Sequence, residues 1–111
     1  DQRMVRWHHW DDENNNYKFQ VAVPVSSNSK PGTGRITAST IPETEALNGS
    51  MFGDYIHLGK AEELMYTYNA DNMKHHLANP WEIEIKGPRN EPDTALWEIQ
   101  IAYPILPKDD M

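Results

Sequence analysis

Three glutamates and a tyrosine are the residues of this chain whose types and spacing best suit ligand binding or catalysis. Glu98 stands within a strongly alternating segment, and Glu82 and Glu84 alternate with apolar residues in another. A carboxylate beside aromatic rings suits a cationic or donor-rich ligand, because the ring faces add a cation–π attraction. Glu84 and Glu98, with Tyr55 nearby, also suit general acid–base catalysis if burial raises one pKa.

Three further residues complete the set of candidate ligand contacts. His57 shares a face with Tyr55 if residues 51–58 form a strand, and Trp7 is available as an aromatic wall. Lys18 occupies the position that matches Glu98 in a repeated segment. An ordinary structural role stays open for each of them: Glu98 can also be a solvated strand residue or pair with Lys18 across a sheet.

The repeated segment is a strand that occurs twice. YKFQVAVPV (17–25) aligns without gaps on WEIQIAYPI (97–105), with Gln, Ala and Pro identical. Both copies alternate between a bulky face and a polar or small face, as in a strand with one face on a core. Such a duplication predicts two related modules, and the exchange of Lys18 for Glu98 marks where they differ.

The remaining segments predict an α+β fold with a mainly antiparallel sheet of about six strands. The expected strands are 4–10, 17–25, 35–41, 51–58, 81–86 and 97–105. Residues 11–16 are polar turn formers and predict a hairpin loop. We expect one domain over residues 1–111, in which 1–25 end a first module, 26–34 form a connector and 35–107 form a second module.

Only residues 60–78 show helical periodicity. Leu64, Tyr68 and Leu77 fall near one side and are expected to pack this single long helix on one face of the sheet. Pro80 stops the helix.

Composition narrows the possible functions. The net charge is −7, and the ten Lys and Arg residues are scattered, so we expect no direct binding of nucleic acid. No apolar run is long enough to span a membrane. The chain has no Cys, which fits a reducing compartment such as the cytoplasm and excludes a thiol nucleophile. It begins at Asp1 rather than at Met, as expected of a fragment or a processed protein.

No cofactor or metal is expected. The pairs His8-His9 and His75-His76 are adjacent in sequence, so neither pair can chelate an ion as a unit. A nucleophilic serine elbow is also missing from the sequence.

Three motifs together resemble the GyrI-like, or AraC-type effector-binding, domain family. They are HLGKAEEL (57–64), PWEIEIKGP (80–88) and WEIQIAYPI (97–105). The resemblance implies an antiparallel sheet of two pseudo-symmetric modules, with helices on one face and a groove for a small organic ligand on the other. The first strand pair and first helix of such a domain have no counterpart in this sequence, and no helix-turn-helix is attached.

The leading interpretation is therefore a small-molecule-binding module rather than an enzyme. It places Glu98, Tyr55 and aromatic neighbours in a groove that prefers flat, cationic ligands. Two alternatives are a hydrolase that uses the groove carboxylates and a protein-interaction module without a small ligand. An incomplete first module leaves sheet edges open, so we expect a homo-oligomer or docking onto the rest of a longer polypeptide.

Overall fold

The computed structural model describes residues 3–11, 13–24, 34, 41 and 43–107. Within these residues the sheet has five strands: β1 (Met4–Asp11), β2 (Asn16–Ala22), β3 (Ala46–Phe52), β4 (Trp81–Lys86) and β5 (Glu98–Pro104). The strand order is β2-β1-β4-β5-β3 with antiparallel pairing throughout, so the predicted α+β class is confirmed. The strand that we predicted at 35–41 lies outside the described residues, apart from Ile41.

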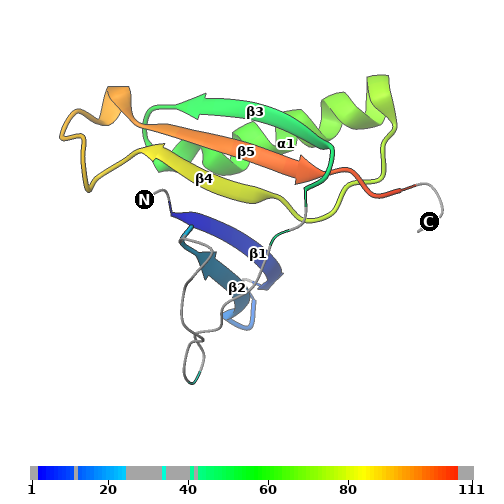
Figure 1. Ribbon diagram of the computed structural model, residues 1–111, viewed down its shortest axis with the longest axis horizontal. Helices are drawn as coiled ribbons and strands as arrows, with labels where there is room; N and C mark the ends of the chain where they lie inside the picture. Colours follow the sequence, from blue (N-terminus) through cyan, green and yellow to red (C-terminus); the bar gives the residue numbers. More distant parts are fainter. Residues whose placement is uncertain (1–2, 12, 25–33, 35–40, 42, 108–111) are drawn as a thin grey trace.

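One helical segment covers part of the sheet. It starts as a short 3-10 helix (Tyr55–His57), continues as α1 (Leu58–Tyr68) and ends in a π-helical turn (Asn69–Met73). In Figure 1, α1 lies behind β3 and β5, whereas the described chain places no helix behind β1 and β2. None of the helices in the described part of the chain is long and apolar enough to cross a membrane.

The core lies between α1 and the β3–β5 end of the sheet. Met51, Ile99, Ile101 and Tyr103 are its buried hydrophobic residues. Leu58, Ala61 and Met65 of α1 pack against them, together with other partly buried side chains. β5 therefore supplies most of this core from alternate positions, as its period of two predicts.

Two predictions about the helix were wrong. Leu64 and Tyr68 are exposed rather than packed on the sheet, because a helix that begins at Leu58 turns Ala61 and Met65 inward instead. The helical segment ends at Met73 rather than at residue 78, since Lys74 adopts a left-handed conformation with φ 58°. Leu77 does pack on the core, but from an extended segment that bridges to Ile105.

The strand that we predicted at 51–58 was also misplaced. β3 ends at Phe52, because Gly53 has φ +102° and turns the chain. The Asp54 side chain then accepts a hydrogen bond from the backbone N–H of Ile56 at 2.9 Å and caps the 3-10 helix. Tyr55 and His57 consequently lie on a helical turn and do not share a strand face.

Candidate functional site

The pairing register decides which glutamates lie on which face of the sheet. Directly opposite residues of antiparallel strands share a face. Glu82 pairs with Ile101 and Glu84 with Ile99, and both isoleucines are buried under α1. Glu82 and Glu84 therefore lie on the helix-facing side of the sheet.

Glu98 lies on the other face, as predicted. Its direct neighbours there are Phe52 on β3 and Lys86 on β4. The sheet thus separates Glu98 from Glu84, so a hydrolase that uses these two carboxylates jointly has no support in the geometry. Lys18 is on β2, and β1 and β4 lie between that strand and the strand of Glu98. These two charges are therefore not brought together.

A pair of carboxyl groups occupies the border between the helix and the sheet. Glu62 on α1 and Glu82 on β4 lie close enough for a side-chain hydrogen bond, which requires that one of them be protonated. The Trp7 indole donates a hydrogen bond to Glu82 Oε1 at 3.2 Å. Glu62 Oε2 is buried and has no hydrogen-bond partner among the described residues. None of the ion pairs within the described chain involves either glutamate.

The titration of Glu62 is strongly perturbed. Burial raises the pKa of Glu62 to about 8, and the hydrogen bond and charge of Glu82 act in the same direction. At neutral pH the Glu62 carboxyl group therefore keeps its proton, which it can donate in the hydrogen bond to Glu82. Burial, followed by the charge of Glu62, also raises the pKa of Tyr103 to about 12.

The second carboxyl cluster is centred on Glu84, and its negative charge is compensated by arginines. Arg3 and Arg89 each form an ion pair with Glu84 at 3.2 Å, and the Tyr55 hydroxyl donates a hydrogen bond to it at 3.3 Å. The Tyr55 ring packs on Trp97, with 5.0 Å between the ring centroids. Burial and the nearby Glu84 raise the pKa of Tyr55. The predicted pair of Tyr55 and Glu84 does come together, in a cluster that anchors the chain after β4.

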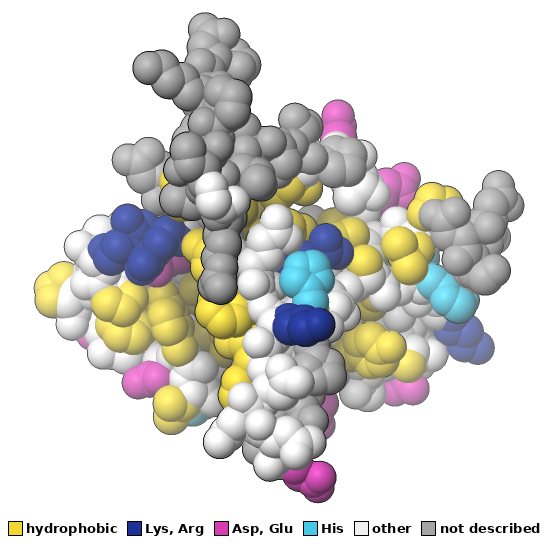
Figure 2. All heavy atoms as spheres, turned by 90° about the horizontal axis from the view of Figure 1, so that it is seen from below, with side chains coloured by type: hydrophobic (Ala, Val, Ile, Leu, Met, Phe, Trp, Pro, Cys, Tyr) yellow, Lys and Arg dark blue, Asp and Glu magenta, His cyan; other side chains and the backbone are white. Residues whose placement is uncertain are grey.

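An aromatic and aliphatic surface adjoins the Glu62–Glu82 pair. Trp7 packs on Phe19 across β1 and β2, with ring centroids 5.0 Å apart. Phe19 and Val21 on β2 are exposed. Figure 2, which views the molecule from the β1–β2 end, shows hydrophobic side chains at the surface there. Of the remaining predicted contacts, His57 and Lys18 are both exposed and lie apart from the carboxyl pair.

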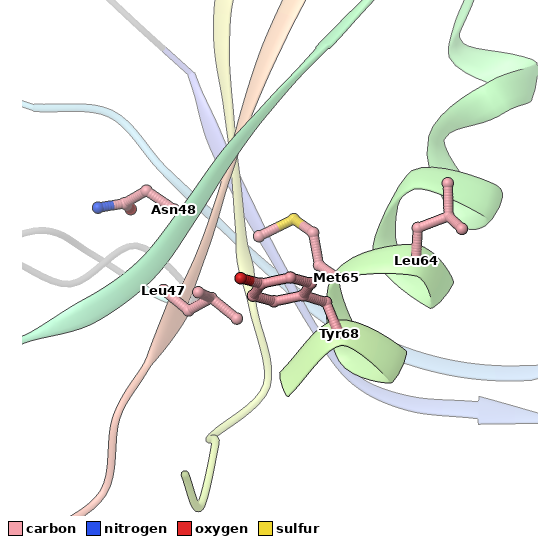
Figure 3. A pocket seen from close by; sticks show the side chains of 5 residues that line it. All are labelled: Leu47, Asn48, Leu64, Met65 and Tyr68. Carbon is pink, nitrogen blue, oxygen red and sulfur yellow. The ribbon is translucent and has the colours of Figure 1, made fainter. Parts of the chain in front are cut away.

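A separate hollow lies at the opposite edge of the sheet, between β3 and α1. Its volume is about 240 Å³, and it is lined by Leu47, Asn48, Leu64, Met65 and Tyr68. Figure 3 shows Leu47 on the strand next to Met65 and Tyr68 on the helix, with Asn48 and Leu64 to either side. No charged residue and none of the predicted ligand contacts lines it, so it does not suit a cationic ligand.

Sequence reasoning missed Glu62 as a site residue. As an acidic residue near the start of the expected helix, Glu62 has an ordinary role available, which is to complement the helix dipole. The available signal was its position next to Ala61, on the helix side that Met65 also occupies. A carboxylate on that side must meet the sheet.

Among the described residues, no group of three or more His, Asp or Glu side chains is placed to hold a metal ion. Comparison with known proteins finds no matching family model, no matching curated protein and no matching solved structure.

Proposed function

We propose that this chain is a small-molecule-binding module of the GyrI-like type. Its ligand would lie on the helix-facing side of the sheet, where β1 and β4 meet α1. One observation carries the proposal: Glu62 and Glu82 form a partly buried carboxyl pair without a cation among the described residues, beside the Trp7–Phe19 ring pair. This assignment moves the ligand to the opposite face from Glu98.

The preferred ligand is flat and carries one positive charge. Burying a carboxylate without a partner is costly, so a cation that reaches Glu62 Oε2 gains a charge-assisted hydrogen bond. The Trp7 ring adds attraction for a cation or an aromatic plane. An anionic ligand is disfavoured by the carboxyl pair and by the net charge of −7. With no Cys in the chain, the module suits a reducing compartment, and we propose a cytoplasmic location.

The proposal is tested with a matched pair of probes at slightly alkaline pH: 9-aminoacridine, which is a cation with N–H donors at this pH, and acridine, which is neutral. Replacement Glu82→Gln keeps the shape of the side chain and the acceptor for the Trp7 indole. We expect it to weaken binding of the cation about tenfold, which is the range of one charge-assisted hydrogen bond. Binding of neutral acridine should be nearly unchanged.

Glu98→Gln is the control, because it makes the same change of charge on the other face of the sheet. If Glu98→Gln weakens binding of the cation and Glu82→Gln does not, the ligand binds on the face of the sheet opposite to α1. If neither replacement changes the affinity for the cation, the chain does not recognise cations through these carboxylates and the proposal fails.

A further inference from the structure

The two copies of the repeated strand differ sharply in burial. Ile99, Ile101 and Tyr103 on β5 are 5%, 1% and 6% exposed. Their counterparts in the first copy, Phe19, Val21 and Val23, are 56%, 54% and 52% exposed. The residue types are those of a core face in both copies. α1 covers the second copy, and nothing in the described chain covers the first.

Among the residues that the structure describes, the helix-facing side of the β1–β2 hairpin is therefore a core face without a second layer. Register and alternation place the residues of this face together, and all are uncharged: Val5, Trp7, Tyr17, Phe19, Val21 and Val23. We call this set the hairpin face. Lys18 and Gln20 alternate with its members and lie on the opposite side of β2.

We infer that a second copy of this chain covers the hairpin face, with the hairpin faces of the two copies packed against each other about a twofold axis. Copies of a chain with a net charge of −7 repel one another electrostatically. The hairpin face contains no charge, so a twofold contact brings no like charges together there. Two sheets pack face to face at about 10 Å, so the partner hairpin would lie at this distance from β1 and β2, on the side of the sheet that carries α1.

The size of the face sets the strength of the contact. It consists of six side chains of the β1–β2 hairpin, whereas a standard interface involves about 20–30 residues and roughly 800 Å² on each partner. The dimer should accordingly form reversibly, with a dissociation constant in the micromolar range rather than the nanomolar range.

The dimer has a consequence for the ligand site, and this consequence rests on the proposed function. β1 and β4 form the floor of that site and α1 forms one wall, through Glu62. The partner hairpin covers the part of the Trp7 ring beside Phe19, the indole N–H edge of Trp7 that meets Glu82 stays at the ligand site, and the partner supplies the missing opposite wall. The ligand site of one copy is thus incomplete without the other copy.

Sedimentation velocity without ligand tests the inference, over concentrations from low micromolar to near millimolar. The wild-type chain should shift from monomer to dimer. Val21→Lys puts a charge at the centre of the hairpin face and should keep the chain monomeric, while its circular dichroism stays unchanged because Val21 is exposed. The control is Ile56→Lys, at a position that is 80% exposed on the 3-10 helix; it should dimerise like the wild type.

The natural absence of Cys provides a second readout. In the dimer, the Val21→Cys variant should form a disulfide-linked dimer under mild oxidation much faster than the Ile56→Cys variant. A wild-type chain that stays monomeric throughout overturns the inference, and so does a dimer that Val21→Lys leaves intact. Because Glu82→Gln should not affect self-association, failure of the ligand proposal and failure of the dimer can be told apart.

Discussion

The carboxyl group of Glu62 on α1 meets the carboxyl group of Glu82 on β4, and the structure offers neither of them a cation among the described residues. The neighbouring glutamate on β4, Glu84, has two arginines and a tyrosine hydroxyl. Two glutamates on the same face of one strand therefore have opposite environments. The charge of Glu84 is compensated and this residue helps to hold the chain together, whereas Glu82 lies beside the protonated carboxyl group of Glu62.

The proton on Glu62 predicts a pH-dependent stability. The pKa of Glu62 in the folded state is raised to about 8 from an ordinary value of 4.5. Between these values the folded state binds more protons than the unfolded state, so stability falls as the pH rises from about 5 to about 8 and then levels off. Since Glu62 is only partly buried, we expect a loss of about 1–2 kcal/mol over this range.

Urea unfolding from pH 5 to pH 9 measures this loss. Glu62→Gln should flatten the profile and make the chain more stable than the wild type above pH 8. Glu63→Gln, on the exposed neighbour that pairs with Lys60 at 3.6 Å, should keep the wild-type slope. Parallel profiles for the wild type and Glu62→Gln would show that the pKa of Glu62 is not raised.

The turn after β4 provides a steric prediction. A Cβ added at Gly87 would collide with the Tyr55 hydroxyl and with the Glu84 carboxyl group. Gly87→Ala should therefore destabilise the fold by about 2 kcal/mol, through overpacking and disruption of the Glu84 cluster. Adding Tyr55→Phe removes one of the colliding atoms and should restore part of the loss.

Gly59→Ala is the matched control for that measurement, because nothing lies within 4 Å of its added Cβ and the residue is helical. Thermal unfolding should show Gly59→Ala to be neutral or stabilised by up to about 1 kcal/mol. If the two alanine variants have equal stability, the close packing around Gly87 is refuted.

Alternation in the sequence was sufficient to place β1, β4 and β5, and it correctly put Glu98 away from the helix. It could not decide which face of β4 lies under α1. Trp81 and Ile83 look like the core side, but the register sends them to the face without the helix and turns Glu82 toward it. Periodicity shows which residues share a face, whereas only the pairing with β5 fixes where that face points.

β3 and the helix start were missed for local reasons. Asn48-Gly49 inside ALNGSMF looks like a turn, but Gly49 lies on the strand, where an added Cβ would come within 2.9 Å of Met65 Sδ on α1 and would displace the end of that side chain. The close approach of helix and strand thus explains a glycine that local propensity reads as a break. Such a tertiary requirement has no signature in a single sequence.

The cap of the helical segment gives a further prediction. Asp54 accepts the backbone N–H of Ile56 and fixes the point where the chain leaves β3. Asp54→Ala should cost about 1 kcal/mol, whereas Asp54→Asn keeps an acceptor and should cost less. Urea unfolding distinguishes the two variants, and equal losses would mean that the cap does not stabilise this turn.

The repeated strand allows one mutation to be compared at two equivalent positions. Ile101 is 1% exposed and its counterpart Val21 is 54% exposed. At low micromolar concentration, Ile101→Ala should cost about 2–5 kcal/mol, since it opens a cavity in the core. Val21→Ala should cost no more than about 0.5 kcal/mol, because its side chain is already in contact with water.

At high concentration the cost of Val21→Ala should grow, because the wild-type dimer is then stabilised by mass action and the variant is not. Urea unfolding at two protein concentrations measures both effects. A large cost of Val21→Ala in the dilute chain would mean that the hairpin face is already covered within a single copy, and a cost independent of concentration would remove the case for a second copy.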